Sequence, residues 1–225
     1  MVLNNWKLVL DVEDVLRAQG ANPTIILARR PLLVDLAEQA LVEGTPLLQP
    51  VVHYQQFSVD ELCHHRLSLI GGGSLCGDLV AQVLASATQV VVIGCTIGSK
   101  LEEHSAKVMA HDLKYGLALN GVGSAAMEAL GKAVCHFINE LAALQGLKAS
   151  MPISPGLTGW PVHEGQSQLF NLIDFAEISI RLMPSGMMHP LKSLTMVIGL
   201  GLDVSESGTQ CDFCALRERC QHRSI

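Results

Sequence analysis

The chain has 225 residues, of which 49% are hydrophobic and 16% are charged, and its formal net charge is −6. This length is enough for one large domain or two small ones, and an aromatic content of only 4% predicts an aliphatic core. The acidic balance argues against nucleic-acid binding through phosphate attraction. Apolar runs are far shorter than the roughly 20 residues that a membrane-spanning helix needs, so we expect no membrane partner.

The N-terminal residues and the cysteines favour a cytoplasmic location. Residues 1–7 lack a basic region followed by a long apolar one, so no signal peptide is predicted. The chain has seven cysteines, an odd number, and four of them are scattered through it: Cys63, Cys76, Cys95 and Cys135. This usage suits a reducing compartment better than a disulfide framework.

Short strands and helices are predicted for the first third of the chain. In chain order they are a strand at 6–10, a helix from Asp11 to about Gly20, a helix over 32–42 opened by Pro31, an edge or interrupted strand at 47–52, and a strand at 66–70. The proline and glycine positions set most of these boundaries.

Longer elements follow. The pattern predicts a helix over 75–87, a buried strand over 89–94, nearly continuous helix from 99 to 147, a helix over 162–175, and strands at 177–182 and 194–202 with a turn at 184–186. A bend is expected near 112–116, because one helix of 49 residues (99–147) would be unusual in a globular domain. Gly121 and Gly123 suggest close helix packing rather than a dinucleotide fingerprint, since the third glycine is not at the required offset.

One loop stands out, with the sequence Ser154-Pro155-Gly156-Leu157-Thr158-Gly159-Trp160-Pro161. Two prolines and two glycines in eight residues fix an irregular backbone. Such a loop leaves N–H and C=O groups without secondary-structure partners, and these can bind the polar groups of a small ligand. The alternative is an ordinary connector between two helices.

This loop, together with Met187-Met188-His189-Pro190-Leu191-Lys192-Ser193, resembles the activation domain of cobalamin-dependent methionine synthase. That domain binds S-adenosylmethionine and presents its methyl group to an inactive corrinoid. The resemblance implies an α+β fold with a twisted, mainly antiparallel sheet flanked by long helices. It also implies one such domain over residues 1–205, with a cysteine-rich tail over 206–225.

The resemblance assigns cofactor contacts by register. The family's Arg-x-x-Pro-Gly-Tyr element falls on 152–157, where Pro155 and Gly156 match, Pro152 replaces the arginine and Leu157 replaces the tyrosine. The family's acidic contact falls on Glu128. The residues implied to contact S-adenosylmethionine or the corrinoid are Glu128, Ser154, Pro155, Gly156, Leu157, Gly159, Met188 and His189.

Two of these residues have plainer alternatives. Methionines adapt their shape to a flat partner, so Met187 and Met188 could contact a corrinoid protein, although core packing is the commoner fate. His189 could be a corrinoid ligand or proton donor, or a loop residue satisfied by its surroundings.

The tail carries a separate signal, with Cys211, Cys214 and Cys220 inside ten residues. A Cys-x-x-Cys pair can place two thiolates on one metal, and the arginines interleaved with these cysteines favour the thiolate form. We predict an iron–sulfur cluster or a zinc ion here. A redox-active pair and incidental cysteines are the alternatives, and His222, Cys95 or an exogenous group could be the fourth ligand.

The chain has no Asp-x-His-x-x-Gly run that would supply a lower corrinoid ligand. The resemblance therefore implies S-adenosylmethionine-dependent reactivation of a corrinoid carried by a separate corrinoid-binding protein. The alternative is a non-catalytic corrinoid-protein partner, or an iron–sulfur or zinc accessory, that has lost S-adenosylmethionine binding. Pro152 and Leu157 favour that alternative, because proline cannot replace the charge and donors of an arginine.

Overall fold

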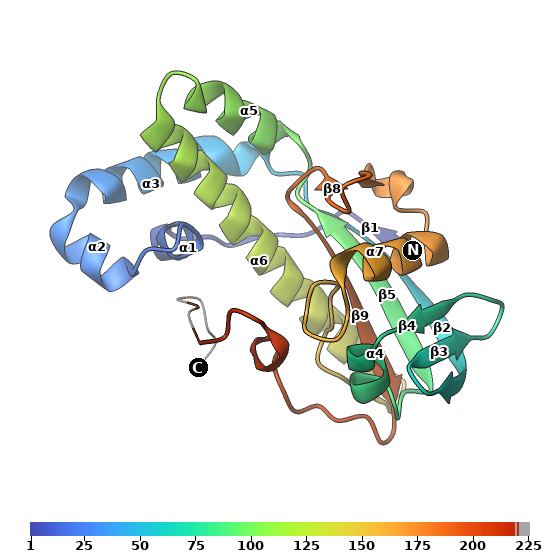
Figure 1. Ribbon diagram of the computed structural model, residues 1–225. Helices are drawn as coiled ribbons and strands as arrows, with labels where there is room; N and C mark the ends of the chain where they lie inside the picture. Colours follow the sequence, from blue (N-terminus) through green and yellow to red (C-terminus); the bar gives the residue numbers. More distant parts are fainter. Residues whose placement is uncertain (219, 221–225) are drawn as a thin grey trace.

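The computed structural model describes residues 1–218 and 220 (Figure 1). In this part of the chain the centre is a seven-stranded antiparallel sheet with the order β4-β3-β2-β5-β9-β6, and β1 pairs with β2. The strands are β1 (Val2–Leu3), β2 (Val51–Cys63), β3 (Arg66–Leu69), β4 (Ser74–Cys76), β5 (Gln89–Thr96), β6 (Lys148–Ala149) and β9 (Ser193–Gly201). A separate two-stranded ribbon joins β7 (Arg181–Leu182) to β8 (Met188–His189). The predicted α+β fold with an antiparallel sheet is confirmed.

The middle of the sheet is the pair β5 and β9, which runs in register from Gln89 opposite Leu200 to Thr96 opposite Ser193. Both strands are buried over nearly their whole length. A strand buried on both faces reads as a continuous β-branched and aliphatic run instead of an alternating one. This explains why the sequence predicts both strands correctly.

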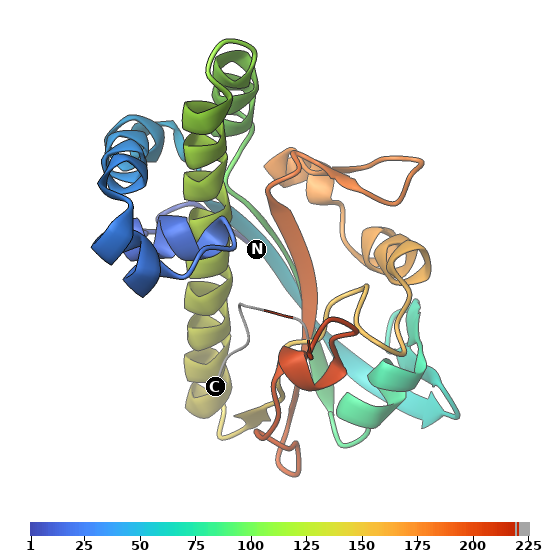
Figure 2. The same cartoon turned by 60° about the vertical axis from the view of Figure 1, so that its left-hand side comes forward.

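Helices cover both faces of this sheet. They are α1 (Val12–Ala18), α2 (Pro23–Arg29), α3 (Pro31–Gly44), α4 (Asp78–Val83), α5 (Lys100–Met109), α6 (Leu113–Leu144) and α7 (Val162–Leu172), with short 3₁₀ turns η1 (Thr45–Leu47), η2 (Phe175–Ile178) and η3 (Gln210–Phe213). Figure 2 shows α6 standing beside the sheet, with α1, α2 and α3 on its outer side. Among the described residues, no helix is both long enough and apolar enough to cross a bilayer.

Helix α6 is the organising element on one face. Asp112 caps its N-terminus by accepting the Tyr115 N–H at 3.0 Å, and α5 ends at Met109, so the predicted bend is confirmed. One side of α6 packs on β5 and β9 through an aliphatic cluster that includes Leu130 and Ile138. Its opposite side packs on α1 and α3.

The other face of the sheet is covered by α4, α7 and η2. This first core cluster contains Trp160 and Phe175, the largest fully buried side chains in the described part of the chain. The predicted loop therefore places Trp160 in the core and runs on directly into α7, whose predicted span of 162–175 is confirmed up to Leu172.

Four local predictions are wrong. Residues 6–10 form no strand, because Trp6 turns back to donate its indole N–H to the Leu3 carbonyl at 3.2 Å and packs edge-on against Phe137. The strand predicted at 47–52 is neither interrupted nor at an edge: β2 begins at Val51, just after Pro50, and lies inside the sheet.

The other two errors assign one element type to segments that contain two. Residues 75–87 are not one helix, because β4 and the extended Gly77 come before α4. Residues 177–182 are not one strand, because Asp174 caps the η2 turn by accepting the Ala176 N–H, and only Arg181–Leu182 pairs as strand β7. The predicted turn after it is confirmed, since the Met183 N–H donates to the Met187 carbonyl at 2.8 Å and Gly186 has φ +81°.

Candidate functional site

A groove of about 570 Å³ lies between α6, β9 and the C-terminal tail, and Glu128 lines it. This volume falls in the range of small-molecule sites, roughly 300–1,000 Å³. Helix α6 contributes Glu128, Lys132 and Cys135, because residues three and four apart share one helix face. Strand β9 contributes Leu194 and Met196, and the tail contributes residues 208–211.

The polar and thiol side chains that α6 presents to the groove are an exposed ion pair and a protonated thiol. The Lys132 ammonium donates to the Glu128 carboxylate at 2.7 Å, and both side chains are at least half exposed. Such an exposed pair contributes little to stability, so the carboxylate can exchange this partner for a ligand cation at low cost. Burial raises the pKa of Cys135 to about 11, which keeps this thiol protonated at neutral pH.

The floor of the groove is close-packed. Cys135 donates to the Met196 sulfur at 3.8 Å. A Cβ at Gly131 would lie 3.4 Å from the Leu194 side chain, so the glycine lets α6 approach β9. Thioether and aliphatic groups thus form an apolar surface next to the Glu128 carboxylate.

Residues 154–161 do not line this groove, and their loop approaches it only where it starts. Pro152 lines the groove, and the Ser154 hydroxyl lies 3.4 Å from the Gln210 amide nitrogen of the tail. Pro155 packs toward Gly165 of α7, Gly156 lies against Val162, and Gly159 lies against α4. The half-buried Leu157 packs on the first core cluster.

Four N–H groups of this loop already donate hydrogen bonds within the protein. The N–H groups of Gly156 and Leu157 donate to the carbonyls of Trp160 and Ser154, and those of Thr158 and Trp160 donate to the carbonyls of Phe213 and Leu157. The prediction of unpaired donors in this loop is therefore wrong for these four groups. Through these bonds the loop contacts both the tail and α7.

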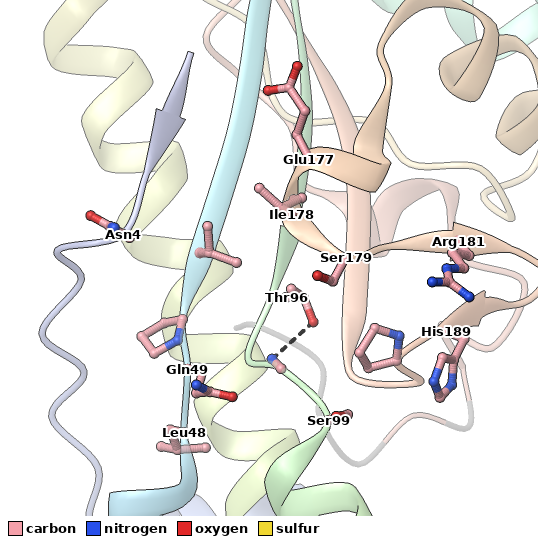
Figure 3. Close-up of a pocket in the computed structure, with 14 residues that line it drawn as sticks. Asn4, Leu48, Gln49, Thr96, Ser99, Glu177, Ile178, Ser179, Arg181 and His189 are labelled. Atoms are coloured by element: carbon pink, nitrogen blue, oxygen red, sulfur yellow. Dashed lines mark hydrogen bonds between the residues drawn. The ribbon is translucent and has the colours of Figure 1, made fainter.

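His189 lies on a different cavity, of about 690 Å³, which Figure 3 shows. Arg181, its partner across the β7–β8 ribbon, lines the same cavity together with the hydroxyl-bearing residues Ser99 and Ser179. Glu128 does not line this cavity, whereas it lines the groove described above. The structure therefore places the predicted contacts Glu128 and His189 on two separate cavities.

The two methionines of the motif differ. Met187 is 57% exposed at the tip of the ribbon, whereas Met188 is half-buried and packs against the first core cluster. The tip adjoins α7, because a Cβ at Gly186 would lie 4.0 Å from the Val162 side chain. Exposed apolar side chains thus stand on both sides of this junction, Met187 on the ribbon and Val162, which is 46% exposed, at the start of α7.

Lys192 of the same motif holds three elements together. Its ammonium donates to the Ser124 hydroxyl of α6 at 2.6 Å, and its carbonyl accepts the Thr96 hydroxyl at 3.0 Å. Burial lowers the pKa of this ammonium, and the nearby Glu102 carboxylate opposes that shift. Lys192 thus fixes the start of β9 against α6 and β5.

The predicted metal ligands lie in the tail, where Cys211 and Cys214 are half-buried. Over residues 1–218 and 220, no three histidine, cysteine, aspartate or glutamate side chains gather into a group that could hold a metal. His222, the possible fourth ligand, lies outside the described residues. Metal binding by Cys211, Cys214 and Cys220 stays a prediction.

Sequence reasoning missed most of the groove. Lys132 and Cys135 follow Glu128 at helical spacing, so the face they share was visible in the sequence. Gln210 and Met196 gave no such signal, because their place depends on how distant segments pack.

Neither a protein-family model nor a curated protein matches this chain. Its structure is similar to the crystal structure of the MetH reactivation domain bound to AdoHcy. The TM-score is 0.65, the sequences are 13% identical, and the match covers 95% of this chain and 83% of that chain. The chain therefore has the fold of the methionine synthase reactivation domain, as the motif resemblance predicted.

Proposed function

We propose that the chain binds S-adenosylmethionine in the groove between α6 and the tail and serves the reactivation of a corrinoid carried by another protein. The observation that carries this proposal is the groove lined by Glu128, on a fold whose relative was crystallised with AdoHcy. The groove has the residues for such a ligand: a carboxylate for its cationic groups, an ammonium at Lys132 for its carboxylate, and an apolar surface at Leu194 and Met196.

In this reaction the protein contributes the positioning of the methyl donor more than reacting side chains of its own. S-adenosylmethionine supplies the methyl group that the corrinoid cobalt accepts once an external reductant has reduced it, and S-adenosylhomocysteine is left behind. The chain's own task is to orient the methyl donor and to exclude water. The Glu128 carboxylate attracts the positive sulfonium and ammonium groups, and the protonated Cys135 thiol does not compete for the methyl group as a thiolate would.

Replacing Glu128 with alanine should weaken S-adenosylmethionine binding about tenfold, since a hydrogen-bonded charge pair contributes about 1.5–3 kcal/mol. Isothermal titration calorimetry of the intact protein measures this. Glu140→Ala is the matched control, because Glu140 lies on the same helix, pairs with His136 and does not line the groove. Equal dissociation constants for the two variants would remove Glu128 from the site.

We place the docking surface for the corrinoid protein at the tip of the β7–β8 ribbon. Met187→Glu should abolish complex formation, because a buried unpaired carboxylate is costly at an interface, and should leave the melting temperature nearly unchanged. The test is co-purification with the cobalamin-binding fragment of a methionine synthase loaded with hydroxocobalamin.

Leu144→Glu serves as the control for added charge, since Leu144 is 87% exposed at the far end of α6. Normal complex formation by Met187→Glu would contradict this surface. A collapsed melt would instead show that Met187 is needed for folding.

A second candidate is an iron–sulfur or zinc accessory protein that has kept the fold and lost the methyl donor. The favouring observation is Pro152, which lines the groove where the family's arginine would stand and offers no side-chain donor. The calorimetry separates the two candidates: no heat from folded protein at millimolar S-adenosylmethionine would contradict the first, and the second requires stoichiometric metal in protein purified without oxygen.

A further inference from the structure

The C-terminal tail returns over the molecule after β9 and comes to rest beside α6 and the loop (Figures 1 and 2). Two apolar side chains hold its ends: Val204 is 3% exposed in the first core cluster, and Phe213 packs against the same cluster. Between them, the residues from 205 to 209 are exposed. The segment from Val204 to Phe213, which we call the bridge, is therefore anchored in the core at each of its ends.

Hydrogen bonds fix where the bridge lies. The Gln210 amide nitrogen donates to the Pro152 carbonyl at 3.1 Å, and the Thr158 N–H donates to the Phe213 carbonyl at 2.9 Å. Thr209 and Asp212 form a reciprocal capping box that shapes the η3 turn between these contacts. A capping box stabilises a helical start by about 1 kcal/mol, so the turn has a defined shape.

The same turn lines the groove opposite Glu128. Gly208, Thr209, Gln210 and Cys211 face the cavity from the tail, and Cys135 faces it from α6. A second, smaller cavity of about 350 Å³ again places Gly208 with Cys135. One wall of the groove is thus formed by the tail.

Gln210 offers the ligand a polar atom at the place where Pro152 offers none. Its amide nitrogen is used by Pro152, whereas its amide oxygen has no hydrogen-bond donor within residues 1–218 and 220. An amide oxygen accepts hydrogen bonds from ammonium, hydroxyl and amino groups. A ligand that carries such donors, in addition to a positive charge for Glu128, would bridge the two walls.

We propose that the tail is a built-in wall of the ligand groove, which shields Cys135 and presents the Gln210 amide to a cationic, donor-bearing ligand. That this ligand is S-adenosylmethionine rests on the proposed function. That the tail forms a wall of the groove does not depend on the proposed function. The two parts therefore need separate measurements.

The wall is tested without any ligand, by the rate at which iodoacetamide alkylates Cys135, followed by mass spectrometry of its peptide. Phe213→Ala removes one anchor and should raise this rate at least severalfold. Gln210→Ala, which removes the amide contacts to Pro152 and Ser154 but leaves the Phe213 anchor, should raise it in the same direction without loss of folding. Ser205→Ala is the matched control, because Ser205 lies on the exposed part of the tail and, among the described residues, its side chain hydrogen-bonds to Ser207 alone. Unchanged rates in both folded variants would overturn the wall.

The ligand contact is tested by calorimetry with S-adenosylmethionine and S-adenosylhomocysteine. Gln210→Ala should weaken binding about tenfold and Ser205→Ala should not. Binding by Gln210→Ala at the wild-type constant would overturn the contact. A wild-type chain that binds neither compound would contradict the proposed function and the Gln210 contact together, and the alkylation rates would then decide whether the wall itself stands.

Discussion

Replacing Trp160 with alanine should lower the free energy of unfolding by about 3–5 kcal/mol, the usual cost of emptying a fully buried aromatic site. Trp160 has no exposed surface. A Cβ at Gly77 or at Gly165 would lie 2.9 Å from its ring, so the link between β4 and α4 on one side and α7 on the other lie directly against the indole. Neither segment can move in to fill the cavity without disturbing the loop that carries Trp160.

The indole N–H also takes part in a group of hydrogen bonds that links α7 to β4. Its N–H donates to the Gln168 amide oxygen at 3.3 Å, and the same amide accepts the Cys76 N–H at 2.9 Å and donates to the Cys76 carbonyl at 3.2 Å. Loss of the ring therefore loosens the link between α7 and β4 as well as the core. Urea unfolding followed by circular dichroism measures the change.

Trp6→Ala is the matched control for the Trp160 experiment. Trp6 is only half-buried and packs edge-on against Phe137, with ring centres 6.0 Å apart. Its replacement should cost clearly less. Equal losses of stability in the two variants would contradict the idea that the full burial of Trp160 sets the cost.

Replacing Gly94 with alanine should lower the free energy of unfolding by about 1–3 kcal/mol, the range for forcing one carbon into a filled core. Gly94 lies in the buried strand β5. A Cβ there would stand 2.4 and 2.5 Å from two ring carbons of Phe175, and that ring is itself fully enclosed. Either the ring or the strand must shift.

A double-mutant cycle with Phe175→Leu checks the cause of this effect. The smaller side chain makes room, so the cost of Gly94→Ala should shrink in the Phe175→Leu background, with a coupling of about 0.5–3 kcal/mol. Gly131→Ala is the control: its Cβ would meet Leu194 at 3.4 Å, and alanine is favoured in a helix. Strict additivity in the cycle would show that the ring is not what excludes the Cβ.

The sequence predicted the elements whose signals are local. Asp112 indicates the start of α6, because its side chain caps the first turn of that helix. The apolar run at 89–94 indicates a strand that is buried on both faces. The error at 177–182 has the same origin: alternating apolar residues suggested a strand, while Asp174, immediately before the η2 turn, carried the capping signal that decided the outcome.

The groove could be predicted only in part. Glu128 and the residues that follow it at helical spacing share a face, and that face is a property of α6 alone. The opposite wall depends on Val204 and Phe213 finding the core, and the segment between them, Ser205-Glu206-Ser207-Gly208-Thr209, has no periodicity that would predict its path. The cysteines of the tail suggested a metal site, whereas Gln210, without any motif, makes the contact to Pro152.

The position of β9 in the sheet has a consequence for how the protein is made. β9 fills the place between β5 and β6, yet it is the last strand of the sheet to be synthesised. While the ribosome makes the 96 residues between Thr96 and Ser193, the β5 edge that later pairs with β9 stays open. An open apolar edge readily pairs with another chain. Helix α6 is completed at Leu144, about midway through this interval, and from then on it can cover one face of β5 while the β5 edge waits for β9.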